Sequence, residues 1–377
     1  MKIAIVGPTH PFRGGISHYT TLLAQRLRES NEVLFVSFSK QYPRFLFPGR
    51  SQIDQSRRPL STESEGLLSF ADPLSWSRSA ARIVEFGAEA VLFSWVNPAL
   101  AMQFRYVSGR VRRDLPGTCI VFWCHNVALH ERIPLSKPLT RKAFRWGDHF
   151  IVSSQEARRD LLQLRPGSSV SVANLPQLDV FRSASSRSEA RRDLGFEEDA
   201  PVALYFGFVR PYKGLMHLIR ALPPAARQVP GLRLLVVGEF WSDVQKYRDE
   251  VERLGVEEMV TIVDRYVPNE EVGRYFEAAD IVVLPYETAS GSGIIQIAYS
   301  FAKPVVTTSV GALVEVVDEG KTGFLVPPCD PQALAGAISG FFRSGTADDF
   351  ARNIERFRER FSWDGFVATL DGLLRKI

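Results

Sequence analysis

The sequence from residue 202 to residue 222 reads VALYFGFVRPYKGLMHLIRAL. Its first five residues form an apolar run that predicts a buried strand, and residues 215–222 have the apolar spacing of a helix. The turn between them carries two cations, Arg210 and Lys213. Ligands of open α/β sheets bind beyond the carboxyl ends of the strands, where this turn is expected to lie. A forked guanidinium beside a point ammonium predicts a clamp for a diphosphate, although a solvated loop would also carry such charges.

The same alternation of strand and helix extends over the whole chain. Continuous apolar strands between helices predict parallel α/β sheets that are covered on both faces. A chain of 377 residues suits two such doubly wound domains. We expect the first domain at residues 1–182 and the second at 183–361, with a polar linker at 182–188. The predicted strands are 2–6, 33–38, 90–95, 119–124, 149–153, 170–173, 202–206, 232–237, 260–263, 281–284, 305–307 and 324–326.

The composition is that of an ordinary globular protein, with 45% hydrophobic and 23% charged residues. No run of 18 apolar residues occurs, so we expect no membrane-spanning helix. Met1 and Lys2 lead directly into the first strand, which leaves no signal peptide, so we expect a cytoplasmic protein. The three cysteines form no CxxC pair, and Cys119 and Cys124, inside an apolar strand, are expected to be core thiols.

The charge is distributed unevenly along the chain. Residues 1–182 contain 24 basic and 14 acidic residues, whereas the remainder contains 22 and 28. A basic first half suggests a polyanionic partner, for which anionic lipid headgroups and nucleic acid are the candidates. No zinc-ligand spacing or RNA-binding aromatic signature supports nucleic acid. The mixture of cations and aromatics at residues 40–50 suits the inner membrane surface or a lipid-linked acceptor, and equally a buried loop with a charged rim.

Two glycines, Gly14 and Gly15, stand where the first strand–turn–helix unit begins its helix at residue 16. Glycines at a helix start let backbone amides approach an anion, although a plain tight turn would use them too. The dinucleotide fingerprint GxGxxG is absent, and the second strand ends in Ser37-Phe38-Ser39 without an acidic residue. This pattern disfavours a NAD-dependent dehydrogenase.

A histidine, His125, directly follows the apolar strand at 119–124, on the same predicted edge. Such a side chain can donate to a sugar hydroxyl or to developing charge on a leaving group, or it can be structural.

A Ser/Gly-rich turn after residue 284 precedes another apolar helix. Amides of Ser292, Gly293 and Ile294 are expected to point at an anion from the helix N-terminus. Alternatively, Ser292 simply caps that helix with its side chain.

In combination these segments resemble glycosyltransferase family 4, the retaining nucleotide-sugar enzymes of the GT-B fold. The resemblance implies two Rossmann-like domains that face each other across a cleft, with a C-terminal helix, here 362–377, that crosses back to the first domain. It also implies that His125, Arg210 and Lys213 are catalytic. The resemblance rests on Arg13-Gly14-Gly15, His125, residues 207–214, Gly238-Glu239, and residues 279–285, 303–306, 311–315 and 320–327. The implied donor-binding residues are Gly14, Gly15, Gly207, Arg210, Lys213, Glu287, Ser290, Gly291, Ser292, Gly293 and Ile294.

The chain departs from that family at its pair of glutamates. Aligned on Lys303-Pro304, the two positions hold Ala289 and Ile297, and Glu287 lies two places from the first. In the family the second glutamate holds the donor ribose and the first touches the transferred sugar. The chain therefore resembles a subgroup in which backbone donors of residues 290–293 replace the acidic pair.

We therefore expect a glycosyltransferase that moves a sugar from a nucleoside diphosphate to a glycan or lipid-linked acceptor, in cell-envelope or exopolysaccharide synthesis. Retention of anomeric configuration is implied by the resemblance. No DxD motif occurs, so we expect no metal and no cofactor besides the donor. Two rivals remain: a two-domain sugar-binding protein of the periplasmic type, and a degenerate GT-B protein that serves as a binding or scaffold subunit.

Overall fold

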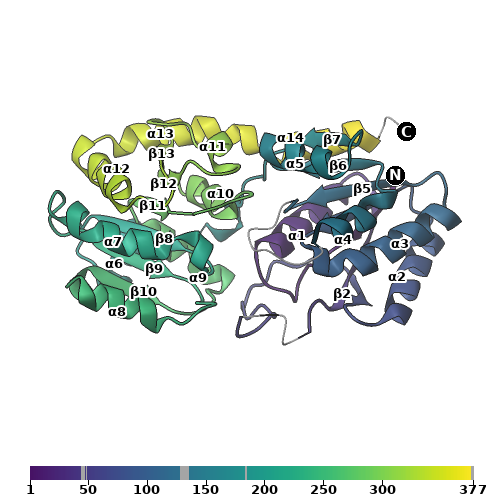
Figure 1. Cartoon of the computed structure of the whole chain (residues 1–377), viewed down its shortest axis with the longest axis horizontal. Coiled ribbons are helices and arrows are strands. Elements are labelled where there is room, and N and C mark those ends of the chain that lie inside the picture. Colours follow the sequence, from purple (N-terminus) through teal and green to yellow (C-terminus); the bar gives the residue numbers. More distant parts are fainter. Residues whose placement is uncertain (44–46, 48, 128–135, 183–184, 375–377) are drawn as a thin grey trace. The chain divides into compact units, whose positions relative to one another are not determined.

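The computed structural model describes residues 1–43, 47, 49–127, 136–182 and 185–374 (Figure 1). The chain divides into two compact units. The first comprises Met1–Gln55, Pro59–Pro176 and Trp363–Ile377, and the second comprises Ser56–Arg58 and Gln177–Ser362. The chain thus passes from the first unit to the second at Gln177, just before the polar stretch 182–188 that is predicted to be the linker.

The first unit contains a seven-stranded sheet in which every neighbouring pair is parallel. Its strand order reverses direction between β1 and β4, as in a doubly wound sheet. From edge to edge the strands are β3 (Glu65–Ser69), β2 (Glu32–Lys40), β1 (Lys2–Val6), β4 (Ala90–Trp95), β5 (Cys119–Cys124), β6 (His149–Val152) and β7 (Ser169–Val172).

The edge strand β3 is the one strand that the sequence analysis missed among the described residues. It has five residues, of which only Leu68 is buried, so it shows no continuous apolar run. Its pairing with β2 is irregular, with register shifts at Ser37/Phe38 and Phe38/Lys40. An edge strand is specified by its partner more than by its own pattern, which is why propensity alone does not find it.

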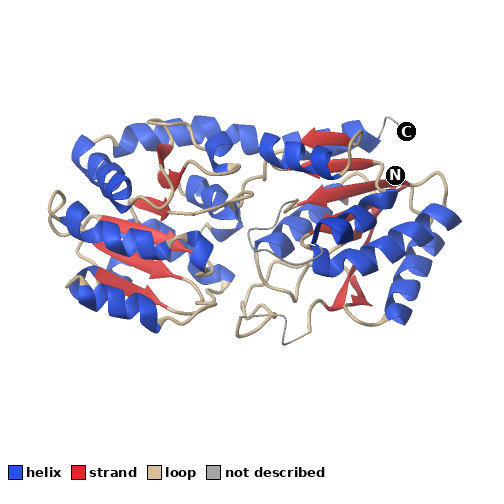
Figure 2. Cartoon of the chain, in the orientation of Figure 1, coloured by secondary structure: helices blue, strands red, loops and turns tan. Residues whose placement is uncertain are grey.

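Helices flank this sheet, and the last helix of the chain is one of them (Figure 2). The ring of Phe366 in α14 lies 4.8 Å from that of Trp123, and the ring of Trp363 lies 6.2 Å from that of Tyr19. These aromatic contacts make the C-terminal helix part of the first unit. The helices are α1 (Gly15–Leu27), α2 (Pro73–Phe86), α3 (Ala101–Asp114), α4 (Ser136–Ala143), α5 (Gln155–Leu164) and α14 (Trp363–Leu374).

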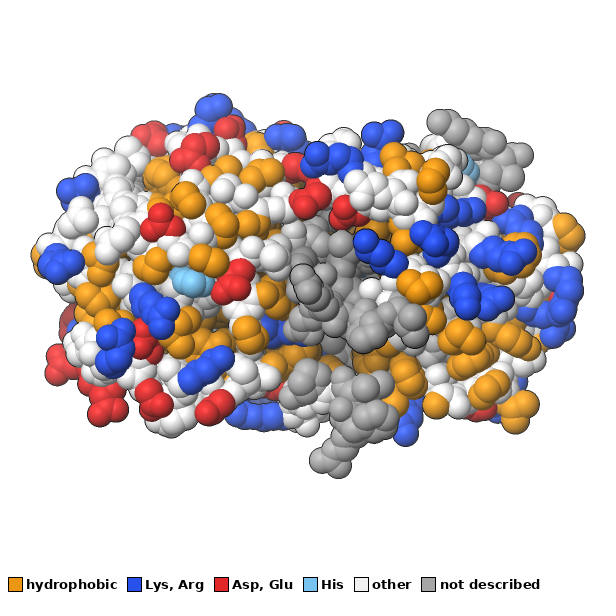
Figure 3. Space-filling view, in the orientation of Figure 1, with side chains coloured by type: hydrophobic (Ala, Val, Ile, Leu, Met, Phe, Trp, Pro, Cys, Tyr) orange, Lys and Arg blue, Asp and Glu red, His pale blue; other side chains and the backbone are white. Residues whose placement is uncertain are grey.

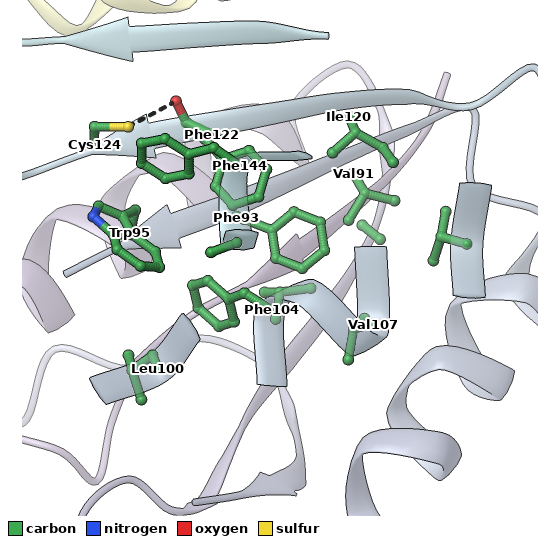
Figure 4. Packing of buried hydrophobic residues seen from close by; sticks show 14 of the residues in the cluster. Val91, Phe93, Trp95, Leu100, Phe104, Val107, Ile120, Phe122, Cys124 and Phe144 are labelled. Carbon is green, nitrogen blue, oxygen red and sulfur yellow. Dashed lines mark hydrogen bonds between the residues drawn. The ribbon is translucent and has the colours of Figure 1, made fainter. Parts of the chain in front are cut away.

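The core of the first unit is rich in aromatic side chains (Figure 4). Phe93 and Phe122, on the neighbouring strands β4 and β5, stack with ring centroids 5.1 Å apart. Phe144 packs edge-on against Trp95 at 4.9 Å. Cys119 and Cys124 are buried free thiols, as predicted for core residues. Phe93, Phe122 and Trp95 are all completely or almost completely buried, so this layer holds β4 and β5 in place.

The second unit contains a six-stranded parallel sheet whose order reverses between β8 and β11. Both units are therefore doubly wound α/β sheets, which confirms the predicted fold class. The strands in order are β10 (Val260–Val263), β9 (Arg233–Val237), β8 (Val202–Phe206), β11 (Ile281–Leu284), β12 (Val305–Thr308) and β13 (Gly323–Val326). The helices are α6 (Arg187–Leu194), α7 (Leu215–Ala226), α8 (Gln245–Arg253), α9 (Asn269–Ala278), α10 (Gly293–Ser300), α11 (Leu313–Val316), α12 (Pro331–Ser344) and α13 (Ala347–Phe357).

A buried ion pair joins α6 to the amino-terminal ends of β8 and β11. The guanidinium of Arg191 is fully buried and donates to both carboxylate oxygens of Asp280 at 2.9 Å. Asp280 also accepts from the backbone N–H of Val202 at 2.8 Å. Arg191 further donates to the backbone carbonyls of Ala278 and Ala200. This network holds the amino-terminal ends of β8 and β11 in place. The predicted diphosphate site lies at the carboxyl ends of the same two strands.

Candidate functional site

The predicted diphosphate turn lies at the point where the strand order of the second unit reverses. β8 and β11 are direct neighbours, with Ala203 opposite Ile281 and Leu204 opposite Val282. The loops that follow them, residues 207–214 and 285–292, therefore leave the sheet side by side at its carboxyl edge. This is the position at which open α/β sheets bind ligands.

A backbone hydrogen bond and a glycine bring these two loops into contact. The N–H of Glu287 donates to the carbonyl oxygen of Tyr212 at 2.7 Å. Gly214 has a φ of 70°, and a Cβ at this position would lie 1.8 Å from the carbonyl oxygen of Pro285. Any other residue at 214 would push the loops apart, so the glycine is a geometric requirement of the site.

The loop after β9 joins them through a second glycine. Gly238 has a φ of 152°, and a Cβ there would lie 1.9 Å from the carbonyl oxygen of Gly207. Three strand-end loops of the second unit thus meet at one edge, with backbone against backbone. Close backbone approach of this kind is a common use of glycine near a ligand.

The two predicted cations lie on this edge beside aromatic rings. The guanidinium carbon of Arg210 lies 5.0 Å from the ring centroid of Trp241 and 5.3 Å from that of Tyr212. The Nζ atom of Lys213 lies 5.4 Å from the ring centroid of Tyr286. Burial lowers the pKa of Lys213, and the neighbouring charge of Arg210 lowers it further against an opposing effect of Tyr212. No acidic side chain in the described part of the chain forms a salt bridge with Lys213, so an anionic ligand would stabilise its charge.

The start of α10 lies against the same loop. A Cβ built on Gly207 would lie 3.5 Å from both the Nζ atom of Lys213 and the Cδ1 atom of Ile294. Gly207 and Lys213 of one predicted segment and Ile294 of another are therefore brought together. Gly293 is the first residue of the helix, so its amide and that of Ile294 are among the unpaired donors of the first turn.

Ser292 occupies the N-cap position of α10 but does not cap the helix with its side chain. Its hydroxyl lies 3.4 Å from the hydroxyl of Tyr286 instead. The alternative that Ser292 acts only as a side-chain cap is therefore wrong. Ser290 and Gly291 precede it in the turn, as the sequence analysis assumed.

Glu287 is exposed, and its Oε1 atom lies 2.9 Å from Nε2 of His217 in the first turn of α7. Cys329, in the loop after β13, lies beside them, and the polar atoms of the three side chains are all within 4.8 Å of one another. No sequence pattern points to His217 or Cys329 as site residues. His217 lies in a helix and the other two residues lie in separate loops, with no motif spacing, so only the fold brings them together.

The two positions of the missing glutamates are both buried in the second unit. Ala289 is 9% exposed and Ile297 is 5% exposed. Next to Ile297 in α10, Gln296 is 1% exposed, and its Oε1 atom has no hydrogen-bond partner among the described residues. Gln296 therefore supplies a polar side chain next to Ile297, one residue before the position that holds the second glutamate in the family pattern.

The remaining predicted residues belong to the first unit. Gly14 has a φ of 110°, a conformation that favours glycine, and directly precedes α1. A Cβ on Gly14 or on Gly15 would meet no atom within 4 Å among the described residues. The described residues thus leave room beside both glycines, as an approaching ligand would require, while Gly14 also meets the needs of a tight turn.

His125 lies at the end of β5 and is held by a buried serine on the neighbouring strand. Its Nε2 atom lies 2.9 Å from Oγ of Ser94, and its ring centroid lies 4.5 Å from that of Trp123. Gly7 makes room for Ser94, because a Cβ on Gly7 would lie 2.7 Å from Cβ of Ser94. Burial lowers the pKa of His125 to about 3, so its imidazole is neutral near pH 7. Such a ring exchanges hydrogen bonds and does not supply a positive charge.

Residues 200–344 match the family model described as glycosyl transferases group 1. A D-inositol 3-phosphate glycosyltransferase of Streptomyces avermitilis is 33% identical over 205 residues, which cover 50% of this chain and 42% of the relative. One from Saccharomonospora viridis is 28% identical over 293 residues, covering 71% and 67%. The chain thus spans 42% of the length of the Streptomyces avermitilis relative, which is less than half.

Solved structures match the chain over its full length. HepE of Anabaena in complex with UDP has a TM-score of 0.76 at 21% identity, covering 100% of both chains. Sucrose-phosphate synthase of Thermosynechococcus elongatus has a TM-score of 0.75 at 21% identity, covering 100% of this chain and 99% of the other. The chain therefore has the GT-B fold. Among the described residues, no helix has the length and apolarity that crossing a membrane requires.

Proposed function

We propose that this chain, which has the GT-B fold and whose residues 200–344 match the group 1 glycosyltransferase model, transfers a sugar from a nucleoside-diphosphate donor to an acceptor. One observation supports this function most directly. Gly207 and Lys213, in the loop that also carries Arg210, meet the start of α10 at the switch point of the second sheet. Two cations and unpaired helix-start amides at one edge are chemically complementary to a diphosphate.

In this proposal the residues act by positioning and by electrostatic stabilisation. Arg210, Lys213 and the amides of Gly293 and Ile294 bind the diphosphate and offset the charge that develops on it as the glycosidic bond breaks. The neutral imidazole of His125 exchanges a hydrogen bond with the transferred sugar. Ser94 occupies Nε2 of His125, so Nδ1 is the ring nitrogen that we assign to the sugar.

We further propose that the reaction retains the anomeric configuration and needs no catalytic metal. The sequence contains no DxD motif, and the cations of the loop after β8 supply the positive charge that a metal would otherwise bring. The acceptor we propose is a glycan or a lipid-linked sugar of cell-envelope or exopolysaccharide synthesis. These finer statements derive from the family resemblance.

The test is release of nucleoside diphosphate from a panel of nucleotide sugars, with and without simple glycan acceptors. UDP-glucose comes first in the panel, because the Anabaena HepE structure was solved with it. Calorimetric titration with the matching nucleoside diphosphates measures binding separately from turnover. Turnover that is lost on Lys213→Met but kept in a surface control, Lys246→Met, would support the assignment. Absence of both binding and turnover across the panel would overturn it.

A degenerate GT-B protein that binds nucleotide sugars without turnover is the second candidate, and it is favoured by Ala289 and Ile297 at the two glutamate positions. The variant Ile297→Glu separates the two. A carboxylate at this buried position costs stability and competes with phosphate at the start of α10, so an active enzyme should not gain from it. A large gain in turnover would identify the natural chain as degenerate.

We also propose that the first half of the chain contacts an anionic membrane surface. Residues 1–182 carry a net charge of +10, and Lys and Arg side chains gather over the first unit on the face in Figure 3. Arg44, part of the predicted basic–aromatic segment, lies outside the described residues. The protein should sediment with anionic vesicles, and less of it should do so as salt rises. The variant Arg50→Glu should also sediment less, and both results would support this contact. Equal sedimentation with neutral vesicles, or none with either, would refute it.

A further inference from the structure

Three side chains of different chemistry meet at the carboxyl edge of the second sheet. His217 lies in the first turn of α7, Glu287 in the loop after β11 and Cys329 in the loop after β13. Nε2 of His217 is 2.9 Å from Oε1 of Glu287. With Sγ of Cys329 included, the three atoms all lie within 4.8 Å of one another. The group is reachable from solvent, since Glu287 and Cys329 are exposed and the side chain of His217 is 17% exposed.

An imidazole, a carboxylate and a thiolate together are a zinc-type ligand set. Zinc binds histidine nitrogen and carboxylate oxygen at about 2.0–2.2 Å and cysteine sulfur at about 2.3 Å in a tetrahedron. Neighbouring ligand atoms are then roughly 3.3–3.7 Å apart, so small rotamer changes of the exposed Glu287 and Cys329 would close the site. Calcium and magnesium prefer all-oxygen sites, which this group does not offer.

The backbone at Cys329 supports a specific placement of its thiol. Cys329 has a φ of 58°, one of only two positive φ values at non-glycine residues in the described part of the chain. A side chain in this left-handed region is strained relative to the usual conformation. Residues in such conformations cluster at sites where they contact ligands.

We propose that His217, Glu287 and Cys329 bind one zinc-class divalent ion, with the fourth coordination position open to solvent. The ion would replace the hydrogen bond between Nε2 of His217 and Glu287 with two coordinate bonds. His217 would carry its proton on Nδ1, and the thiol proton of Cys329 would pass to solvent.

The site adjoins the loops to which the proposed function assigns the diphosphate. Cδ2 of His217 would lie 3.4 Å from a Cβ on Gly214, the residue after Lys213. The backbone of Glu287 is hydrogen-bonded to Tyr212. An ion held by both side chains therefore connects the start of α7, directly after the loop that follows β8, to the loop after β11. Its occupancy should change nucleotide affinity. That last consequence depends on the proposed function, whereas binding of the ion does not.

The test uses the full-length, untagged and reduced protein without nucleotide, titrated with Co²⁺ and then with Zn²⁺. We expect one Co²⁺ per chain, with the visible bands of tetrahedral cobalt and a thiolate charge-transfer band, and displacement by Zn²⁺. Cys329→Ser should abolish the charge-transfer band. His217→Gln, which keeps a hydrogen-bonding group toward Glu287, should weaken binding at least tenfold, and so should Glu287→Gln.

Matched controls are Cys119→Ala, which removes a buried thiol, and His149→Gln, which removes a histidine of the first unit. Both should bind Co²⁺ as the unmodified protein does, and thermal unfolding should verify that every variant is folded. An octahedral cobalt spectrum without charge transfer would overturn the proposal, and so would the same affinity in Cys329→Ser and His217→Gln. Ion binding without any nucleotide binding would leave this site standing and would contradict the proposed function instead.

Discussion

The backbone N–H of Glu287 lies 2.7 Å from the carbonyl oxygen of Tyr212, and this bond joins the loops after β11 and β8. Glu287 is thereby fixed through its backbone, while its side chain pairs with His217. One residue thus connects the predicted diphosphate edge to the cluster with Cys329. The contact depends on the close approach at Gly214 and Pro285.

Replacing Gly214 by alanine should disturb this approach. The new Cβ would lie 1.8 Å from the carbonyl oxygen of Pro285, in addition to the cost of a left-handed alanine. Gly231→Ala is the matched control, since its φ is 77° but its Cβ would meet only Pro201 at 3.8 Å. We expect a loss of about 1–2 kcal/mol in unfolding free energy for the control and clearly more for Gly214→Ala. Urea unfolding of both variants measures this, and equal losses would contradict the contact.

Removing Arg210 or Lys213 should weaken nucleoside diphosphate binding by about 1.5–3 kcal/mol per lost charged contact. Because burial lowers the pKa of Lys213, its charge should be lost at a lower pH than that of an ordinary lysine. As pH rises, the affinity for nucleoside diphosphate should therefore begin to fall before the pH range in which an ordinary lysine loses its proton. Lys213→Arg should remove that fall. Calorimetric titrations over an alkaline pH series would measure both effects. Unchanged affinity in folded Arg210→Ala and Lys213→Ala would rule out the clamp.

His125 should affect turnover and acid stability, each with its own measurement. His125→Ala should lower turnover more than nucleoside diphosphate affinity, because its proposed partner is the transferred sugar. Its folded pKa of about 3 lies below the unfolded value of about 6.5. The stability contribution is therefore fully present above about pH 6.5 and is lost as pH falls toward 3.

His125→Gln should flatten part of this acid dependence, because glutamine does not titrate and retains a partner for Ser94. The comparison needs unfolding curves at several pH values between 4 and 7, with His149→Gln as the control. His18, whose pKa burial lowers to about 4, should leave a residual slope. A slope identical to that of the unmodified protein would show that His125 titrates normally.

Asp280→Ala should destabilise the second unit strongly. The change leaves the guanidinium of Arg191 buried without its carboxylate, and loss of one partner of a buried pair costs about 3–5 kcal/mol. The exposed pair of Asp349 and Arg352 is the control, for which Asp349→Ala should cost at most about 1 kcal/mol. Chemical denaturation followed by circular dichroism would compare them. Similar small losses in both variants would mean that the buried pair adds little.

The sequence by itself determined the parts of this protein whose information is local. Apolar runs such as 202–206 and 281–284 specify buried strands wherever they lie, because burial on both faces of a parallel sheet needs apolar side chains at every position. The position of Arg210 and Lys213 after a strand follows from the same pattern. The edge strand β3 escaped it, because only Leu68 of its five residues is buried and it therefore has no continuous apolar run.

Tertiary structure alone decided which loops meet. Sequence order separates His217 from Cys329, and Gly214 from Pro285, by long stretches that carry no information about their approach. The strand order places β8 next to β11 and brings their carboxyl ends to one edge. The contact between Gly214 and Pro285 then follows from backbone geometry. His217, Glu287 and Cys329 meet because the start of α7 and the loops after β11 and β13 share that edge.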